Sequence, residues 1–509
     1  MKIKFQENEF WYGTCVKYGM KMPIGSDTEI ELDLTSNPTP NQAMPLLIST
    51  KGRSIWSDQG FPVRVGDGAI EVPDSCLLEE TGGSLREAYL GVMKEHFPFR
   101  GMPAENLFGK IIYNTWIELT YNQNEEDILA YARRILESGM PSGVLMIDDG
   151  WAENYGDWRF HSGKFPHPEQ LLKTLHEIGY EVMVWICPFI SPDSLKYREA
   201  KEEGILVLTS EGETYLAKWW NGYSAVLDFS NPKAVQWLKR QLDALLDMGV
   251  NGFKFDAGDS MYYRNDNVTF GNVTPDEQSR MWAEFGEQYP YNEYRAAFRA
   301  GGYALLQRLC DKDHSWGENG IASLIPDTLL QGITGHTFGC PDMIGGGEYL
   351  NFQNMEKSGL DEELFVRHCE IACLMPAMQF SAAPYRILTG ENFACILKSI
   401  EVRKKFLPYI MEELKKASVT GEPLIRYLTY EFPEENVENV TDQFMLGGKY
   451  LVAPVYEKGK TGRTLYLPKG KWYARKRVWM SQGETIYCES ERGIPIIFER
   501  MGKFSGGKE

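Results

Sequence analysis

The sequence is poor in basic residues and in histidine. Its 509 residues include 53 Lys or Arg against 71 Asp or Glu, which gives a net charge of −18, and only seven residues are His. This negative charge repels phosphate groups, so we expect no nucleic-acid partner and no binding to an anionic membrane surface. The scarcity of histidine and the lack of a His-Glu-x-x-His motif argue against a zinc hydrolase. We expect neither a metal nor an organic cofactor.

Motifs of several other enzyme classes are also missing. No Gly-x-Gly-x-x-Gly sequence follows a strand and opens a helix, and the chain has no Walker loop. The Gly-x-Ser-x-Gly turn of serine hydrolases is absent as well. These absences argue against nucleotide-dependent chemistry and against an esterase of that type.

The cysteines do not form a recognisable framework. There are nine, an odd number, and no two are spaced as Cys-x-x-Cys. Several lie in apolar runs, where cysteine behaves as a small buried hydrophobic residue. Residues 1–11 lack the charged-then-apolar pattern of a signal peptide, and no apolar run is long enough to cross a membrane. We therefore expect a reducing, cytoplasmic location.

The chain is rich enough in apolar residues to form a large core, with 43% hydrophobic and 13% aromatic residues. Residues 1–105 contain short β-like runs between turn residues, which predicts an N-terminal β-sandwich. Over residues 106–390, strand-like runs alternate with amphipathic helices. This α/β alternation predicts a parallel sheet closed into a (β/α)8 TIM barrel. Residues 391–509 predict a linking helix over 395–416 followed by a C-terminal β-sandwich.

Within the barrel region the pattern predicts individual elements. We expect strands over residues 111–119, 143–147, 181–186, 252–255 and 305–309. We expect helices over residues 125–138, 168–178, 232–248 and 294–304.

The stretch from Gly252 to Asp259 combines a buried strand with reactive side chains. Lys254 and Asp256 are two residues apart, so they lie on the same face of the strand. Glycine follows at Gly258, where the chain must turn. Barrel enzymes carry their reactive groups at the C-terminal ends of the strands, which favours a catalytic role here. The alternative is a structural Lys–Asp pair that ends the strand.

Other predicted strands also end in acids. Asp148 and Asp149 precede Gly150 and Trp151, and Asp311 and Asp342 follow later strands. Paired acids can bind two hydroxyl groups of a sugar, while a nearby Trp stacks on its apolar face. The alternatives are a helix N-cap and a hard-metal site. Because glycoside hydrolysis needs two carboxylates, and because tryptophan and glycine accompany these acids, we favour a sugar site.

The chain resembles glycoside hydrolase family 31 over nearly all of its length. Within that family it is most similar to the myogenesis-regulating glycosidase group. The following sequences carry the resemblance: Phe253-Lys254-Phe255-Asp256-Ala257-Gly258, Asp311-Lys312-Asp313 ahead of Trp316, Pro341-Asp342-Met343-Ile344-Gly345-Gly346, Met378-Gln379-Phe380-Ser381, and Asp442-Gln443-Phe444-Met445-Leu446-Gly447.

The resemblance implies a retaining double displacement by an exo-acting α-glycosidase. Asp256 would be the nucleophile, and Lys254 would help to keep it ionised. Asp311, five residues before Trp316, would be the acid/base, although Cys310 stands where the family usually has glycine. Asp313 and Glu318 are alternatives for that role.

The remaining site residues are candidates for sugar contacts, and for Trp185, Trp220, Arg308 and His336 a structural role is the open alternative. Asp342 would hold the sugar or tune the acid. The other candidates for substrate binding are Asp148, Asp149, Trp151, Trp185, Trp220, Arg308 and His336, with Gln379 as a weaker one.

The resemblance also bears on substrate and partners. Asp148-Asp149-Gly150-Trp151 is similar to a galactose-binding motif, and the Arg-x-His of starch-type α-glucosidases is missing near Met378. Both features favour an α-galactoside within an oligosaccharide or glycoside. The alternatives are an α-glucosidase, another α-hexosidase, a transglycosylase, or a sugar-binding protein on a retired glycosidase scaffold. The chain could also form a homo-oligomer, although no residue identifies the interface.

Overall fold

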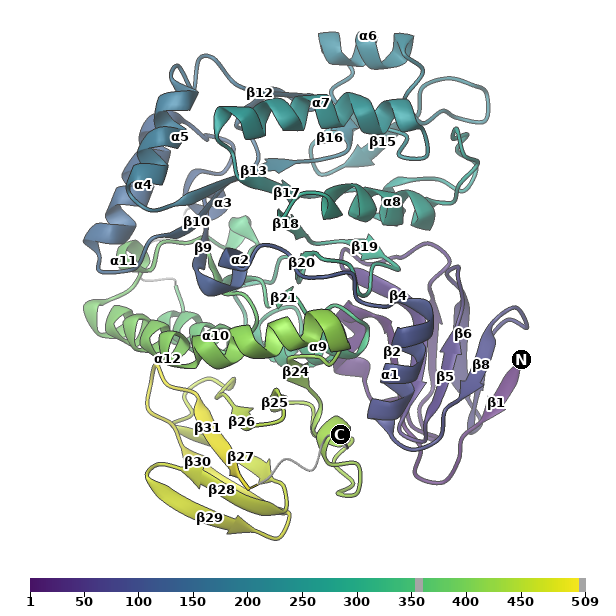
Figure 1. Cartoon of the computed structure of the whole chain (residues 1–509), viewed down its shortest axis with the longest axis vertical. Coiled ribbons are helices and arrows are strands. Elements are labelled where there is room, and N and C mark those ends of the chain that lie inside the picture. The colour runs from purple at the N-terminus through teal and green to yellow at the C-terminus, as the bar shows by residue number, and fades with distance from the viewer. Residues whose placement is uncertain (353–359, 503–509) are drawn as a thin grey trace.

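The computed structural model describes residues 1–352 and 360–502. A barrel occupies the middle of the molecule, with the N-terminal sheets against one side and the C-terminal sheets beyond helix α12 (Gly390–Thr420) (Figure 1). This arrangement confirms the predicted fold class of a TIM-type barrel between two β domains. The boundaries predicted near residues 105 and 390 stay predictions.

The barrel is built from parallel strands in the order β21-β20-β18-β17-β13-β10-β9-β23-β22. The two end strands, β21 and β22, are separated in the chain only by Pro341 and Asp342, so the sheet curls round on itself. The strands are β9 (Ile111–Asn114), β10 (Gly143–Ile147), β13 (Glu181–Ile186), β17 (Gly252–Phe255), β18 (Tyr291–Tyr294), β20 (Leu306–Arg308), β21 (Gly339–Cys340), β22 (Met343–Ile344) and β23 (Gln379–Phe380).

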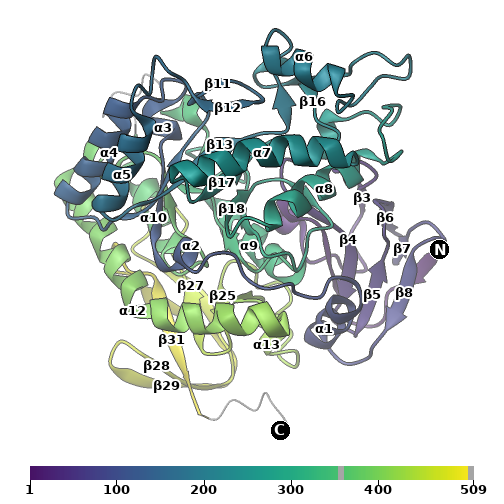
Figure 2. The same cartoon turned by 45° about the horizontal axis from the view of Figure 1, so that its top comes forward.

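Helices cover the outside of these strands (Figure 2). The main ones are α4 (Glu125–Glu137), α5 (Pro168–Glu177), α7 (Pro232–Met248), α8 (Pro275–Glu287), α9 (Leu324–Ile333) and α10 (Glu362–Ala372). Shorter helices are α2 (Asn106–Gly109), α3 (Trp116–Leu119), α6 (Leu195–Glu202) and α11 (Pro384–Ile387).

Helix α7 shows how local sequence delivers the central strand. Asn231 caps its first turn by accepting a hydrogen bond from the backbone of Lys233, and proline occupies the first helical position. Gly249 ends the helix with a φ of 118°, a left-handed conformation that favours glycine. The chain then enters β17 directly, which brings the end of that strand to the barrel mouth.

Two barrel predictions are wrong. Residues 294–304 do not form a helix: β18 ends at Tyr294, and β19 (Ala297–Phe298) pairs with β4 (Gln42–Ser49) of the N-terminal sheet. The alanine-rich pattern suggested a helix, but pairing with a strand distant in sequence determines the outcome. The strand predicted over 111–119 ends at Asn114, and α3 follows it.

The N-terminal region forms two sheets and one helix. One sheet has the order β1-β7-β6-β3, and the other has β19-β4-β5-β8 with β2 paired to β4. The strands are β1 (Lys2–Lys4), β2 (Trp11–Cys15), β3 (Ile30–Asp33), β5 (Arg53–Trp56), β6 (Pro62–Gly66), β7 (Ala69–Glu71) and β8 (Leu77–Glu80), and the helix is α1 (Leu85–His96). Because β19 comes from the barrel, the two regions share a sheet.

Beyond α12, the chain forms a six-stranded sheet and a two-stranded one. Their strands are β24 (Ile425–Arg426), β25 (Phe444–Leu446), β26 (Tyr450–Ala453), β27 (Gly462–Leu467), β28 (Gly470–Ala474), β29 (Arg477–Ser481), β30 (Glu484–Glu489) and β31 (Ile496–Met501). The helix predicted over 395–416 lies inside the longer α12.

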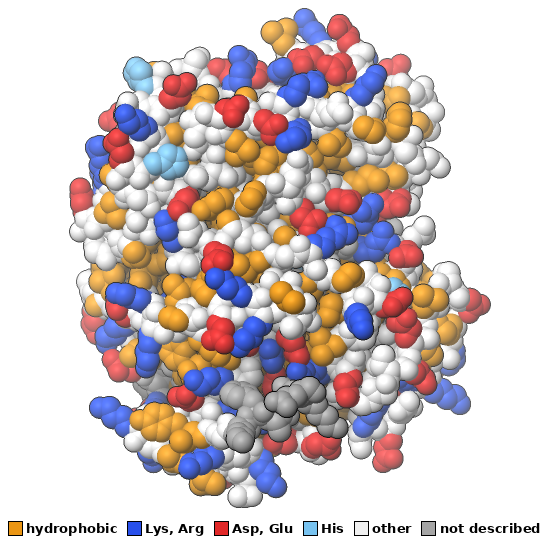
Figure 3. All heavy atoms as spheres, viewed as in Figure 1, with side chains coloured by type: hydrophobic (Ala, Val, Ile, Leu, Met, Phe, Trp, Pro, Cys, Tyr) orange, Lys and Arg blue, Asp and Glu red, His pale blue; other side chains and the backbone are white. Residues whose placement is uncertain are grey.

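Neither the surface charges nor the cysteines identify a binding partner. On the face seen in Figure 3, acidic and basic side chains are interspersed. In the described part of the chain, no helix is both long and apolar enough to span a bilayer. All nine cysteines lie in that part too; they are buried, and none of them forms a disulfide.

We expect Gly252→Ala to destabilise the barrel. A Cβ atom at this position would lie 2.0 Å from the backbone oxygen and 2.4 Å from the Cβ atom of Tyr291 on the adjacent strand β18. Strand β18 would have to move, at a cost of about 1–3 kcal/mol or more in the free energy of unfolding. Thermal or urea denaturation measures this. Gly109→Ala is the matched control, since its Cβ would enter open space; equal stability of the two variants would contradict the prediction.

Candidate active site

A cavity of about 350 Å³ lies at the carboxyl ends of the barrel strands. Its acidic lining residues are Asp148, Asp149, Asp256, Asp311 and Glu348. Its aromatic lining residues are Trp116, Tyr121, Trp185, Trp220 and Tyr349, and its basic ones are Lys17, Lys254 and Arg295. Acids and aromatic rings around a small cavity are the side chains that sugar binding requires.

Asp256 stands at the end of β17 and is almost fully buried. Its Oδ1 accepts hydrogen bonds from Arg295 Nε at 3.0 Å and from the backbone N–H of Ala257 at 2.8 Å. Its Oδ2 accepts one from Trp185 Nε1 at 3.0 Å. Burial alone would raise the pKa of Asp256, but Arg295, Lys254 and other positive charges outweigh it and hold that pKa well below its usual value. Asp256 is therefore ionised.

Lys254 forms its ion pair with Asp148 and not with Asp256, which lies two residues further along the chain. Its Nζ lies 2.6 Å from Asp148 Oδ2, and both side chains are buried. Burial lowers the pKa of Lys254, but the attraction of Asp148 outweighs this and the pKa is raised. The lysine is thus a fixed positive charge that joins the ends of β10 and β17.

Asp149 is held differently from Asp148. Its Oδ2 accepts hydrogen bonds from Asn221 Nδ2 at 2.9 Å and from the Tyr155 hydroxyl at 3.1 Å. Its buried Oδ1 has no partner among the described residues. Burial, followed by repulsion from Asp148, raises the pKa of Asp149 to about 7. This carboxyl group can therefore exchange a proton near neutral pH.

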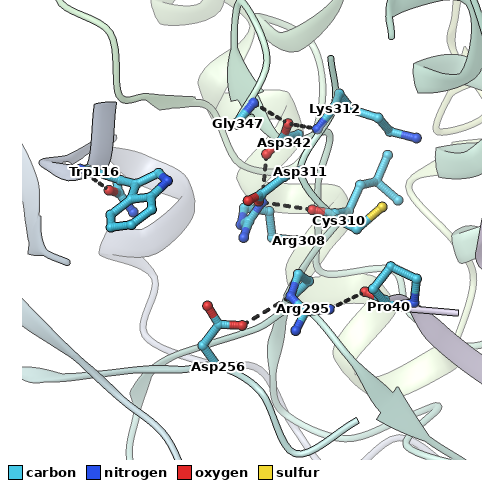
Figure 4. Close-up of polar contacts among 12 residues, drawn as sticks. Pro40, Trp116, Asp256, Arg295, Arg308, Cys310, Asp311, Lys312, Asp342 and Gly347 are labelled. Carbon is cyan, nitrogen blue, oxygen red and sulfur yellow. Dashed lines mark hydrogen bonds and ion pairs between the residues drawn. The ribbon is translucent and has the colours of Figure 1, made fainter. Parts of the chain in front are cut away.

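Asp311 belongs to a cluster around Arg308 (Figure 4). Arg308 Nη1 lies 2.7 Å from Asp311 Oδ1 and 2.6 Å from Asp342 Oδ1, while Arg308 Nε lies 3.3 Å from Glu293. The Asp311 side chain is 40% exposed, whereas the other three are buried. Arg308 thus anchors the one acid of the cluster that reaches the cavity.

Asp342 is fixed from several directions behind Asp311. Its Oδ2 accepts hydrogen bonds from the backbone N–H groups of Lys312 at 2.8 Å and Gly347 at 2.9 Å. Burial raises the pKa of Asp342 to about 7, the positive charge of Arg308 opposes this, and repulsion from Asp311 adds to it. A Cβ at Gly347 would lie 2.6 Å from Met343 Cε, 2.9 Å from Asp342 Oδ1 and 3.0 Å from Asp311 Oδ1, so a larger residue there would require these side chains to shift.

Most of the residues predicted for the site meet in or around the cavity. Asp148, Asp149, Trp185, Trp220, Lys254, Asp256 and Asp311 line it. Arg308 and Asp342 lie behind Asp311 rather than at the cavity surface. Of the three alternatives for the acid, Asp311 is the one that lines the cavity; Asp313 and Glu318 do not.

Trp151 and His336 do not have the positions that direct sugar contact would require. Trp151 is fully buried, and its Nε1 donates to the backbone oxygen of Trp185 at 2.7 Å. His336 is also buried, its Nδ1 lies 3.0 Å from the Thr334 hydroxyl, and burial lowers its pKa to about 3. Gln379 donates to the buried Glu293 at 2.6 Å. These three residues support the barrel wall instead.

The sequence did not identify Arg295, whose guanidinium group forms an ion pair with Asp256. It follows β18, where the sequence predicted a helix, so its position at a strand end was hidden. Asn221 and Tyr155 were also missed as partners of Asp149. Asn221 follows the candidate Trp220 at the tip of the hairpin formed by β15 (Leu216–Trp219) and β16 (Gly222–Val226), and its place beside Trp220 was the signal available in the sequence.

Among the described residues, no group of three or more His, Cys, Asp or Glu is arranged to hold a metal ion.

We expect Asp149→Asn to stabilise the protein at pH 8 and to change its stability little at pH 4. The folded-state pKa of about 7 lies above the ordinary value of about 3.9, so ionisation of Asp149 costs stability as the pH rises between those values. An asparagine avoids that cost and can still accept from Asn221 and Tyr155. The melting temperature at several pH values measures this.

Asp148→Asn is the matched control for this substitution. It leaves Lys254 buried without its counter-charge, so we expect it to destabilise the protein at pH 8. A lower melting temperature for Asp149→Asn at pH 8 would contradict the assignment of a raised pKa.

Two family models match this chain. The glycosyl hydrolases family 31 TIM-barrel domain matches residues 102–413, and the family 31 C-terminal domain matches residues 421–502. The first match covers more than half of the chain and includes every acidic residue of the cavity.

Known proteins show the same relationship. The "Myogenesis-regulating glycosidase" of Mus musculus is 34% identical over 424 residues, which are 80% of this chain and 58% of that protein. "Alpha-xylosidase XylQ" of Lactiplantibacillus pentosus is 27% identical over 463 residues, 84% of this chain and 58% of that protein. The chain therefore spans a little over half the length of these two curated relatives.

Among solved structures, a GH31 family sulfoquinovosidase from E. rectale superposes with a TM-score of 0.84 at 18% identity, covering 99% of this chain and 82% of that one. This similarity shows the fold. The match to the family 31 TIM-barrel domain and the similarity to the mouse protein together show that the chain belongs to glycoside hydrolase family 31, a family of retaining α-glycosidases.

Proposed function

We propose that this chain is a retaining, exo-acting α-glycosidase that hydrolyses a terminal α-linked hexose, and that the hexose is galactose. One observation carries the proposal: Asp256, kept ionised by buried positive charges, lines the same small cavity as Asp311. An ionised nucleophile and a second, more exposed carboxyl group are what a double displacement needs.

In the first step, a carboxylate oxygen of Asp256 attacks the anomeric carbon. The bond from that carbon to the glycosidic oxygen breaks, and Asp311 gives its proton to the departing oxygen. Asp342 lies directly behind Asp311 on Arg308, and burial raises the pKa of Asp342 to about 7, so Asp342 itself can hold a proton near neutral pH.

In the second step, Asp311 acts as a base. It takes a proton from water, the water oxygen bonds to the anomeric carbon, and the ester bond to Asp256 breaks. The Asp256 carboxylate is released in its ionised form, which Arg295 and Trp185 stabilise by hydrogen bonding. The proton on Asp311 and the free carboxylate of Asp256 are both restored.

The other side of the cavity is suited to holding the sugar. Asp148 and Asp149 line the cavity with carboxylate oxygens that can accept from hydroxyl groups, and the Oδ1 of Asp149 has no hydrogen-bond partner among the described residues. Trp220, 46% exposed at the rim, offers an aromatic face. A volume of about 350 Å³ is at the small end for ligand pockets, which supports action on a single terminal sugar.

The choice of galactose rests on the Asp148-Asp149-Gly150-Trp151 sequence and on the missing Arg-x-His near Met378. Relatives are named for other sugars, among them α-xylosidase and sulfoquinovosidase. The alternatives are therefore another α-hexosidase, a transglycosylase of the same family, and a sugar-binding protein that has lost turnover.

The first test is a panel of nitrophenyl α-glycosides bearing galactose, glucose, xylose and sulfoquinovose. We expect the wild-type protein to prefer the galactoside, and Asp256→Ala and Asp311→Ala to lose about 10²-fold or more of kcat, because each removes one of the two reacting carboxyl groups. Preference for a different sugar would overturn the galactose assignment alone. An Asp256→Ala variant with wild-type turnover would overturn the mechanism, and binding without turnover would favour the sugar-binding alternative.

We expect Trp185→Phe to move the acidic limb of the pH profile of kcat/KM to higher pH. The indole N–H stabilises ionised Asp256, so its loss raises the pKa of the nucleophile while an aromatic ring is kept. Trp158→Phe is the control: Trp158 packs against Trp185, but its own Nε1 has no partner in the described structure. An unchanged acidic limb in Trp185→Phe would contradict the role of this hydrogen bond.

A further inference from the structure

Three consecutive residues of the N-terminal region reach the barrel mouth. Pro40, Asn41 and Gln42, which we call the N-terminal strap, lead into β4. Gln42 pairs with Ala297 of β19, two residues after Arg295. The strap therefore lies against the segment that carries the main partner of Asp256.

The first and last residues of the strap hold Arg295 and Arg308, the arginines that bond Asp256 and Asp311, in place. The backbone oxygen of Pro40 accepts from Arg295 Nη1 at 2.7 Å, as Figure 4 shows. Gln42 Nε2 donates to the backbone oxygens of Arg295 at 2.5 Å and Arg308 at 2.9 Å. One side chain thus connects the ends of β18 and β20.

Asn41 makes two contacts with Cys310, the residue before the acid. Asn41 Oδ1 accepts from the backbone N–H of Cys310 at 2.8 Å, and Asn41 Nδ2 donates to Cys310 Sγ at 3.1 Å. Asn41 is fully buried, and its own backbone oxygen accepts from Asn37 Nδ2 at 2.8 Å. The amide is therefore a rigid clamp, supported from the N-terminal side.

This clamp matters because Asp311 has little packing of its own. Its side chain is 40% exposed, and Arg308 is the cation that holds its carboxylate. The backbone around it is anchored at Leu309, which donates to the oxygen of Cys340 at 2.9 Å, and at Lys312, which donates to Asp342. Cys310 lies between these two anchors and directly precedes Asp311. Its N–H bond to Asn41 therefore fixes the backbone on the N-terminal side of Asp311.

We propose that Asn41 is a positioning residue for general acid catalysis, and that it acts on Asp311 through the backbone of Cys310. This inference rests on the proposed glycosidase function. Asp311 must meet the glycosidic oxygen at hydrogen-bonding distance, and a misplacement of about 1 Å can cost about 10²-fold in rate. Loss of the clamp should therefore impair proton donation and leave the attack by Asp256 largely intact.

The first experiment compares two substrates of the same sugar that differ in their need for an acid. Fluoride leaves α-galactosyl fluoride with little protonation, whereas the sugar oxygen of an α-galactosyl-glucose disaccharide must be protonated. We expect Asn41→Ala to lower kcat/KM for the disaccharide by about 10- to 100-fold and for the fluoride by less than about 3-fold. In Asn41→Ala, the basic limb of the pH profile of kcat/KM for the disaccharide should also move.

Two further variants separate the clamp from general stability. Cys310→Ala removes the sulfur contact but keeps the backbone bond, so we expect a loss of less than about 3-fold on both substrates, if the N–H bond carries the effect. Ser54→Ala, a buried position on β5 that bonds Glu79, should leave both activities unchanged. An equal loss on both substrates in Asn41→Ala would overturn the positioning role.

Hydrogen–deuterium exchange tests the clamp without any substrate. We expect Asn41→Ala to speed exchange in the peptide covering residues 309–313, and Ser54→Ala to leave it unchanged. Unchanged exchange in Asn41→Ala would overturn the proposal, whatever the activity. A wild-type chain that cleaves no glycoside would overturn the proposed function, and with it the catalytic meaning of the clamp, while exchange would still report on the clamp itself.

Discussion

The guanidinium group of Arg295 bonds two buried carboxylates, Asp256 and Asp259, and the backbone oxygen of Pro40. Each of these groups would be costly to bury without a partner, since a charge taken out of water needs an opposite charge or a hydrogen bond. One side chain therefore fixes Asp256, the loop after β17 and the N-terminal strap together. It also explains why the chain bends after Tyr294, because Arg295 must face the cavity while Ala297 pairs with Gln42.

This dependence marks the limit of what the sequence could predict. The alternation of strands and helices, and the placement of Lys254 and Asp256 on one strand face, follow from periodicity within a few residues. The role of Arg295 depends on β19 joining β4, a pairing between residues roughly 250 positions apart in the chain. No local pattern contains that information, and the local pattern around Ala297 pointed to a helix instead.

The tryptophans show a second limit. Trp151 and Trp220 both stand beside glycine or a turn, so sequence context treats them alike. The structure buries Trp151 completely and leaves Trp220 46% exposed at the cavity rim. The neighbouring Trp219 is buried as the last residue of β15, whereas Trp220 follows it in the turn, where no strand pairing fixes the direction of its side chain. Sequence context alone does not show where the strand ends and the turn begins.

Asp256 and Asp311, the two acids to which we assign the chemistry, differ because positive charge is shared unequally around the barrel mouth. Asp256 is influenced by Arg295, Lys254 and Arg308, which together outweigh its burial. Asp311 and Asp342 both bond the single cation Arg308, which Glu293 also contacts. A carboxylate surrounded by cations is kept ionised, as Asp256 is. Where several acids share one cation, the buried Asp342 has its pKa raised to about 7. Asp256 and the acids at Arg308 thus differ in their surroundings.

The acids to which we assign the chemistry and the acids to which we assign sugar binding are held by different parts of the chain. Hydrogen bonds of the N-terminal strap reach Arg295, Arg308 and Cys310, next to the two acids to which we assign the chemistry. Asp148 and Asp149 are held by Lys254, Asn221 and Tyr155, which all belong to the barrel. A change in the N-terminal sheet should therefore reach the reacting carboxyl groups first. Changes in the barrel loops should reach the sugar hydroxyl groups first, so the two regions can vary independently in rate and in specificity.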